Sequence, residues 1–279
     1  MAEQSGSCGG CCCPKTALGK ASSCTESTGK LEEWSVGADG KEKMSVYIAN
    51  GGGVKKCGCA VVFVPDVFGI DSGRTKALAD LVASRCGYEV VVPDVFLGNP
   101  LDSLDNIATW IVQFPASVVV PRLRSVVERL RGAEHNNKRV GVFSFCWGAW
   151  CAAHASAQGV ELDCLCNFHP SFRCEGFFGG SDVGLATSVR CPMLMCGASD
   201  DPDNVKPGGE VEKVLQEKKL RCVTHPFPDM KHGFCNRGEL SDPQVSRDVD
   251  KAIELGFEML CAELCGKNPD CECPCVATK

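Results

Sequence analysis

The sequence predicts an α/β protein, with a doubly wound, mainly parallel sheet and helices on both faces. Three observations lead to this prediction. Between residues 59 and 263, short continuous apolar runs alternate with helix-length segments. Such runs are typical of strands buried on both faces of a parallel sheet, with the helices as crossovers. Residues able to do chemistry directly follow several of these runs, at the strand ends where such sheets bind ligands.

An antiparallel hairpin is expected at one edge of the sheet. Two short segments, 31–36 and 44–49, flank the turn sequence GADG at 37–40. Glycine and aspartate between two strand-like segments favour a tight turn. The buried strands are expected at 60–64, 89–92, 140–143, 162–168, 193–196 and 221–226. The helices are expected at 73–86, 101–114, 118–131, 146–157, 208–219 and 242–263.

Length and composition indicate one domain with short tails. The 279 residues suffice for a single α/β core. Residues 1–30, rich in Gly, Ser and Cys, are interpreted as a flexible leader, 31–264 as the domain and 265–279 as a Cys-rich tail. No apolar run approaches the ~20 residues of a membrane span, and no signal-peptide pattern opens the chain, which favours a cytoplasmic location. The net charge of -6, without a basic stripe, argues against nucleic acid and favours a small-molecule partner.

The strongest chemical motif follows the expected strand at 140–143. The sequence SFCWG at 144–148 leads into a helix of small residues. Small residues two positions before and after Cys146 suit a nucleophile elbow, a tight turn from strand to helix in which neighbouring backbone approaches closely. A thiol at a helix N-terminus is also favoured as the thiolate. The alternative is that Cys146 is one more buried cysteine among 22.

Two later loops supply an acid and a base. Asp200 follows the expected strand at 193–196, and His232 stands in the loop after the next strand. The order nucleophile, acid, base is that of α/β-hydrolase triads, so we predict a triad of Cys146, Asp200 and His232. In this triad His232 takes the thiol proton, and the acid orients its ring. The choice of Asp200 over Asp201 stays open at this point, and a solvated acidic turn is the alternative.

Further strand ends contribute candidate pocket residues. The turn PDVFGI at 65–70 follows the first buried strand. The backbone N–H groups of Val67 and Trp147 are therefore predicted to form an oxyanion hole. His169 and Phe234 follow other strand ends and are candidates for lining the substrate pocket, although a structural role in the core is the alternative for each.

Together these segments resemble the dienelactone hydrolase family, most closely its eukaryotic, fungal-type members, over roughly residues 30–262. The matching segments are PDVFGI at 65–70, VPDVF at 92–96, SFCWG at 144–148, HPSF at 169–172 and KHGFCNRG at 231–238. The resemblance implies an α/β-hydrolase fold. It also implies hydrolysis of a small ester or lactone through an acyl-enzyme on Cys146, as in carboxymethylenebutenolidases, with no cofactor and no metal.

The resemblance assigns two more roles. Asp66 stands where bacterial members usually have Glu, and the acid there can hold the thiol protonated until substrate binds. Arg237 is a candidate for binding a substrate carboxylate. Bacterial members use a pair of arginines for this purpose, whereas LGNP at 97–100 contains no second Arg.

Two other interpretations come from different classes of protein. The terminal clusters CGGCCC at 8–13 and CEC at 271–273 with Cys275 suggest a thiol-rich protein that binds metal or senses redox state on a hydrolase scaffold, because neighbouring thiolates bind Zn or Cu(I). Alternatively, the scaffold serves only for binding and has no catalytic activity. Neither the physiological substrate nor the oligomeric state follows from the sequence.

Overall fold

The computed structural model describes residues 13–23, 27–53 and 57–268, and within them it forms one eight-stranded sheet. The strand order is β1-β2-β4-β3-β5-β6-β7-β8. The strands are β1 Lys30–Val36, β2 Glu42–Ile48, β3 Cys59–Val64, β4 Glu89–Pro93, β5 Arg139–Phe145, β6 Cys164–Phe168, β7 Met193–Ala198 and β8 Cys222–Phe227. All of the expected strands are confirmed to within a few residues.

Most of the sheet is parallel. Strands β4, β3, β5, β6, β7 and β8 pair in parallel, whereas β1 pairs with β2, and β2 with β4, antiparallel. The edge hairpin is therefore confirmed, with Gly37 and Gly40 in the left-handed region at φ 90° and 69°. Because the parallel strands point the same way, the residues that follow β3, β5, β7 and β8 meet at one edge of the sheet.

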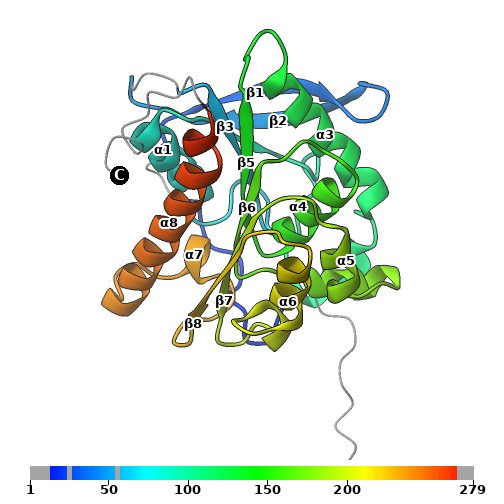
Figure 1. The fold of residues 1–279 in the computed structure, drawn as a ribbon, viewed down its shortest axis with the longest axis vertical. Helices are drawn as coiled ribbons and strands as arrows, with labels where there is room; N and C mark the ends of the chain where they lie inside the picture. The colour runs from blue at the N-terminus through cyan, green and yellow to red at the C-terminus, as the bar shows by residue number, and fades with distance from the viewer. Residues whose placement is uncertain (1–12, 24–26, 54–56, 269–279) are drawn as a thin grey trace, which may run out of the picture.

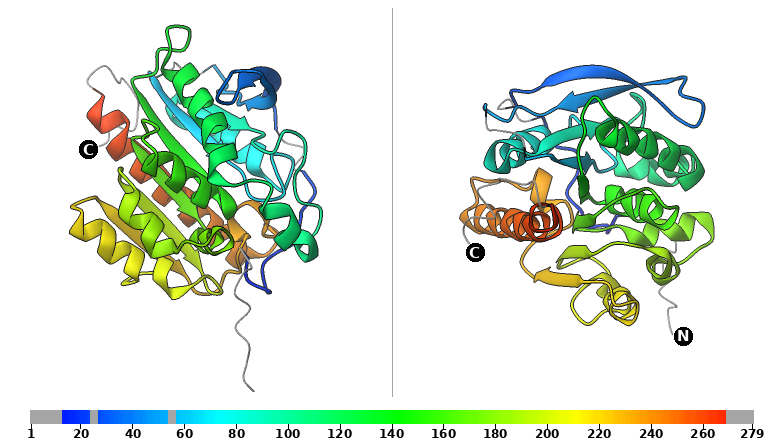
Figure 2. Two further views of the ribbon diagram at one scale, coloured as in Figure 1. Left: turned by 90° about the vertical axis from the view of Figure 1, so that its right-hand side faces the viewer. Right: turned by 45° about the horizontal axis from the view of Figure 1, so that its top comes forward.

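Helices cover both faces of the sheet, as predicted (Figure 1). On one side lie α1 Thr75–Cys86 and α8 Pro243–Glu263, and on the other lie α3 Ala116–Arg131, α4 Trp147–Ala157, α5 Asp182–Ser188 and α6 Glu210–Glu217. In the left view of Figure 2 the green helices face the viewer with the sheet behind them, and in the right view the strands lie between the two groups of helices. Alternate residues of each strand point into one of two apolar cores, such as Val62 into the first and Phe63 into the second.

The short elements are where sequence and structure differ. The helix expected at 101–114 is a 3₁₀ turn, η1 Leu104–Asn106, followed by the short α2 Ile107–Ile111. Four further short elements were not predicted: η2 Phe172–Phe178, α5, η3 Asp203–Val205 and α7 Phe234–Arg237. Each spans seven residues or fewer, too few to show a helical period of 3.6 residues. A last 3₁₀ turn, η4 Cys265–Lys267, follows α8.

Part of the predicted leader packs against the domain. Cys13 is buried, and Gly73 donates a backbone hydrogen bond to Ala21. The leader cysteines before Cys13 and the tail cysteines from Cys271 onward lie outside the described residues. Among the helices described, none is long and apolar enough to cross a membrane.

Candidate active site

Cys146 sits at a sharp turn between β5 and α4. Its φ of 54° and ψ of -119° lie outside the regions that non-glycine residues usually adopt, as a nucleophile elbow requires. A Cβ placed on Gly148 would lie 2.3 Å from the carbonyl oxygen of Val64. At the other small position, the hydroxyl of Ser144 donates to Asn167 Oδ1 at 2.7 Å. Both small residues therefore serve the close approach of this turn to neighbouring strands.

The acid that contacts the histidine ring is Asp201. Its Oδ1 lies 2.6 Å from His232 Nδ1, and both side chains are fully buried. The other oxygen of Asp201 accepts the backbone N–H of Ala198 at 2.7 Å, so the end of β7 holds the carboxylate in place. A ring nitrogen of His232 lies within 4.8 Å of Cys146 Sγ. Sulfur, imidazole and carboxylate thus form one connected, buried group.

Asp200, the acid predicted for the triad, does not contact the ring. Its Oδ1 accepts the backbone N–H of His232 at 2.7 Å, and its Oδ2 accepts the hydroxyl of Thr16 at 2.6 Å. The prediction of Asp200 as the partner of the imidazole is therefore wrong, and Asp201 takes that place. Neighbouring residues in the turn after β7 point in different directions, and the sequence does not reveal which of the two points inward.

The surroundings favour a charged His232. Burial by itself lowers the pKa of this imidazole, but the Asp201 carboxylate and the nearby Cys146 sulfur outweigh burial and hold the pKa well above its usual value. The protonated ring is then stabilised beside a sulfur that can become a thiolate. This is the arrangement in which a cysteine and a histidine exchange one proton within the site.

Asp66 and Arg237 form a second buried pair next to the thiol. The Arg237 guanidinium contacts Asp66 Oδ2, which also accepts from Asn236 at 2.7 Å, while Oδ1 accepts the backbone N–H of Phe68 at 2.8 Å. Burial, partly offset by Arg237, raises the pKa of Asp66, and the Cys146 charge raises it further. Asp66 thus interacts with the thiol through its charge, while both of its oxygens have other partners.

The two remaining pocket candidates, His169 and Phe234, lie close to His232. His169, at φ 41°, packs edge-on against His232 with 4.8 Å between ring centroids, and its two ring nitrogens are buried without hydrogen-bond partners in the described structure. Burial, reinforced by His232 and Arg237, holds the pKa of His169 well below its usual value, which keeps this ring neutral. Phe234 is also buried, and its ring centroid lies 5.9 Å from that of His169. His169 therefore lies beside His232, and Phe234 lies beside His169.

The leader packs against Cys146, which the sequence did not indicate. Cys13 Sγ lies 3.3 Å from Cys146 Sγ, with only 1% of Cys13 exposed. The backbone of Leu18 makes two hydrogen bonds to the segment from His232 to Arg237. Its N–H donates to the carbonyl of His232 at 2.9 Å, and its carbonyl accepts from Arg237 Nε at 3.2 Å. Figure 1 shows this segment in dark blue beside α7. Cys13 belongs to a Cys-rich run with no strand or helix pattern, so nothing in the sequence connects it to the site.

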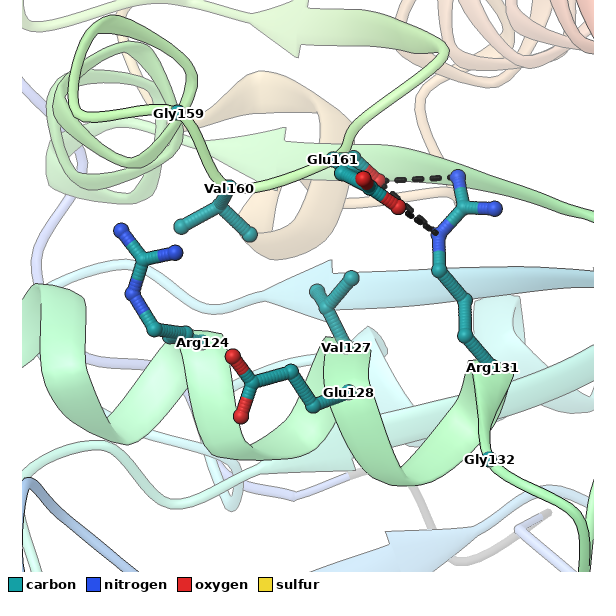
Figure 3. Close-up of a pocket in the computed structure, with 8 residues that line it drawn as sticks. All are labelled: Arg124, Val127, Glu128, Arg131, Gly132, Gly159, Val160 and Glu161. Carbon is teal, nitrogen blue, oxygen red and sulfur yellow. Dashed lines mark hydrogen bonds and ion pairs between the residues drawn. The ribbon is translucent and has the colours of Figure 1, made fainter.

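A separate hollow of about 380 Å³ lies elsewhere (Figure 3). It is lined by the second half of α3 and the loop after α4, including Arg131 and Glu161. Arg131 also donates to the carbonyl of Lys138, directly before β5 begins, whereas Cys146 follows the end of that strand. The hollow is therefore at the opposite edge of the sheet from the triad and holds none of the predicted site residues.

Comparisons with known proteins identify a family and relatives of this chain. The dienelactone hydrolase family model matches residues 44–264. A carboxymethylenebutenolidase homolog of Xenopus tropicalis is 28% identical over 72% of this chain and 80% of its own length. An uncharacterized AIM2 family protein of Schizosaccharomyces pombe is 28% identical over 68% of this chain and 76% of its own length.

Solved structures extend the comparison to the fold. A dienelactone hydrolase-like promiscuous phosphotriesterase from metagenomic libraries superposes with a TM-score of 0.60 at 18% identity, over 83% of this chain and 98% of that one. An acylaminoacyl peptidase of Pyrococcus horikoshii gives 0.64 at 16% identity, over 85% of this chain and 42% of that one. These identities support a shared α/β-hydrolase fold. With a family match that spans nearly the whole sheet and the elbow within it, the chain belongs to the dienelactone hydrolase family.

Proposed function

We propose that this protein hydrolyses a small carboxylic ester or lactone, with Cys146 as nucleophile, His232 as acid and base, and Asp201 as the residue that orients the imidazole. The observation that carries the proposal is the buried contact of 2.6 Å between Asp201 and His232, next to a cysteine at a strained elbow. Family membership and the carboxymethylenebutenolidase homologs support the ester or lactone class of substrate.

The proposed reaction has two halves. In the first, the Cys146 thiolate attacks the carbonyl carbon, and the bond to the alcohol oxygen breaks as imidazolium His232 gives that oxygen its proton. In the second, His232 takes a proton from water, the hydroxide displaces sulfur, and the acid leaves. The backbone N–H groups of Val67 and Trp147 are proposed to bind the oxyanion. The parallel pairing of Val64 with Ser144 supports this, because it brings the turns after β3 and β5 together at one edge.

Pocket roles follow from charge and burial. His169 is neutral and offers two nitrogens without protein partners, so we assign it to a polar group of the substrate. Arg237 is balanced by Asp66, yet its Nη2 has no hydrogen-bond partner in the described structure, and this atom is proposed to bind a substrate carboxylate. Phe234 would form an apolar wall, and Asp66 would modulate the thiol through its charge.

Hydrolysis of a panel of lactones and nitrophenyl esters tests the proposal. Wild type is compared with Cys146→Ala and with Cys222→Ala, whose half-buried thiol on β8 serves as the matched control. Turnover should vanish in Cys146→Ala and persist in Cys222→Ala, with all three proteins folded by circular dichroism. Equal turnover in the two variants would reject Cys146 as the nucleophile.

The contact between Cys13 and Cys146 favours a second role, as a redox-controlled site. A peroxide would oxidise the Cys146 thiolate to a sulfenic acid, releasing hydroxide or water. The Cys13 thiol would then displace water from this sulfur and form a disulfide. The two sulfurs, now 3.3 Å apart, need to approach only to the ~2.0 Å of an S–S bond. The product would block the nucleophile until a thiol reduces it.

Peptide mapping after exposure to hydrogen peroxide tests this second role independently of hydrolysis. A cross-linked peptide pair containing Cys13 and Cys146 is expected in the wild type, with loss and dithiothreitol-dependent recovery of turnover. In Cys13→Ser, peroxide should instead leave Cys146 as a sulfinic or sulfonic acid that dithiothreitol does not restore. Overoxidised Cys146 and unlinked Cys13 in the wild type would refute the disulfide.

A further inference from the structure

Four thiols that take no part in the proposed catalysis meet on the other side of the sheet. They come from two places far apart in the sequence: Cys57 and Cys59 at the start of β3, and Cys261 and Cys265 at the end of α8 and in η4. The Sγ atoms of Cys57, Cys59 and Cys265 all lie within 4.8 Å of one another. Cys261 lies close to this group, because Tyr88 Oη donates to its Sγ at 3.9 Å and also lies 3.1 Å from the Sγ of Cys265. We call these four residues the thiol cluster.

The backbone is shaped to bring the first pair together. Gly58, between the two cysteines, has a φ of 69°, in the left-handed region that a residue with a side chain rarely adopts. This conformation turns the chain between Cys57 and Cys59, and both sulfurs lie within 4.8 Å of the Cys265 sulfur. The backbone N–H of Cys57 donates a hydrogen bond to the carbonyl of Gly87 at 3.0 Å. The pair is thus held on framework elements and does not depend on the terminal tails.

Polar groups surround the sulfurs. Tyr88 Oη lies 3.1 Å from Cys265 Sγ, and Asn268 Nδ2 donates to Cys59 Sγ at 3.5 Å. Metal-bound thiolates characteristically receive such hydrogen bonds from residues outside the ligand set. Cys57, Cys59 and Cys265 are at most 6% exposed.

We infer that the thiol cluster is a structural zinc site with Cys57, Cys59, Cys261 and Cys265 as the four ligands. In tetrahedral coordination with Zn–S bonds of ~2.3 Å, the sulfurs lie ~3.8 Å apart. The sulfurs of Cys57, Cys59 and Cys265, which lie within 4.8 Å of one another, reach this spacing with small side-chain rotations. Cys261, four residues before Cys265 and in contact with the same Tyr88 hydroxyl, supplies the fourth sulfur. Binding releases four protons as four thiols become thiolates around one Zn²⁺. An all-sulfur set selects zinc over the oxygen-preferring Mg²⁺ and Ca²⁺.

The location indicates a structural role. Cys59 pairs with Arg139, the first residue of β5, whereas Cys146 comes directly after Phe145, the last residue of the same strand. Seven residues of extended strand therefore separate the two sites, about 20 Å at ~3.3 Å per residue. A metal here would bind the start of β3 to the C-terminal end of α8, which packs across β5, β6 and β7. It would stabilise the domain without entering the reaction.

Zinc content and cobalt spectra of the full-length protein test this site. Wild type should retain one zinc per chain after dialysis and, once reloaded with Co²⁺, show intense sulfur-to-cobalt charge-transfer absorption. The double variant with Cys57→Ser and Cys265→Ser should lose both the zinc and the charge-transfer absorption. Cys261→Ser, at a half-buried position that tolerates a hydroxyl, should still fold and show weaker charge-transfer absorption, because only three sulfurs remain. Its ester hydrolysis should be unchanged.

Two controls separate this site from the other thiols. Cys146→Ala removes a ligand of the second close group, formed by Cys13, Cys146 and His232, and a triple variant with Ser at 271, 273 and 275 removes the tail thiols. Both should keep the zinc, and a chelator should lower their melting temperature as it does in the wild type. Zinc that is lost in either control but kept in the cluster variants would overturn the inference, and so would a wild type that binds no zinc.

Discussion

Replacing Asp201 by Asn separates the two acids that follow β7. The change leaves an amide in place of the carboxylate that contacts His232 Nδ1 at 2.6 Å, with both groups fully buried. Removing one partner of a buried ionic hydrogen bond costs about 3–5 kcal/mol. If the pair is formed in the transition state, this cost corresponds to a loss of about 10²–10⁴-fold in kcat/KM. The raised pKa of His232 should fall with it, because the Asp201 carboxylate is the main charge that raises it.

Asp200→Asn is the matched control, since it makes the same change one residue away. Asp200 is only half-buried, and its Oδ1 accepts a backbone N–H, a role that an amide oxygen can keep. We expect a loss below about tenfold, equivalent to less than ~1.4 kcal/mol. The assay is kcat/KM on a nitrophenyl ester, with melting temperatures to confirm that both variants are folded. A loss in Asp200→Asn equal to or larger than that in Asp201→Asn would refute the assignment.

Three further predictions concern stability. His169 has a lowered pKa in the folded state, so below about pH 6.5 the unfolded chain binds a proton that the folded protein does not. As the pH is lowered through this range, the unfolding free energy of the wild type should therefore fall more steeply than that of His169→Phe. Equal slopes of unfolding free energy against pH, measured in urea melts, would contradict this. Gly148→Ala should lower the unfolding free energy by more than ~2 kcal/mol, because its Cβ would lie 2.3 Å from a β3 carbonyl oxygen. The control Gly176→Ala, with no atom within 4 Å of the new Cβ, should change the unfolding free energy by less than ~0.5 kcal/mol. Similar changes in the two variants would argue against a tight elbow. Asp66→Asn should lower the unfolding free energy by about 3–5 kcal/mol, since it leaves the Arg237 guanidinium buried without a counter-charge. The double variant with Asp66→Asn and Arg237→Met should recover part of this loss in a double-mutant cycle. Additive effects of the two changes would show that the pair is not coupled.

The sequence predicts the framework because buried parallel strands have a clear signature. Val140–Phe143 is continuously apolar and is covered on both faces in the structure, so its pattern alone locates β5. The elbow is also visible in the sequence, because the small residues that its close approach to β3 and β6 requires, Ser144 and Gly148, stand two positions before and after Cys146. Cys146 and His232 therefore lie where the sequence predicts them, in the turn after β5 and in the loop after β8.

The rest of the site depends on contacts that are not local. Asp200 and Asp201 are chemically identical in the sequence, and only the direction of the turn after β7 brings Asp201 to the ring. The contact of Cys13 with Cys146 joins an irregular segment to the core across 133 residues. The same is true of the thiol cluster, whose two halves lie at the beginning and the end of the domain. Such pairings need the tertiary structure.

Trapping the acyl-enzyme tests the central claim most directly. The reduced protein is mixed with excess nitrophenyl acetate, quenched in acid within the first turnovers, and analysed by intact mass and by peptide mapping. A single acetyl group on the peptide that contains Cys146, absent in Cys146→Ala and longer-lived in a His232→Ala variant treated alike, is the predicted result. Rapid hydrolysis by a wild-type protein that never carries an acyl group on Cys146, with turnover preserved in Cys146→Ala, would contradict the account.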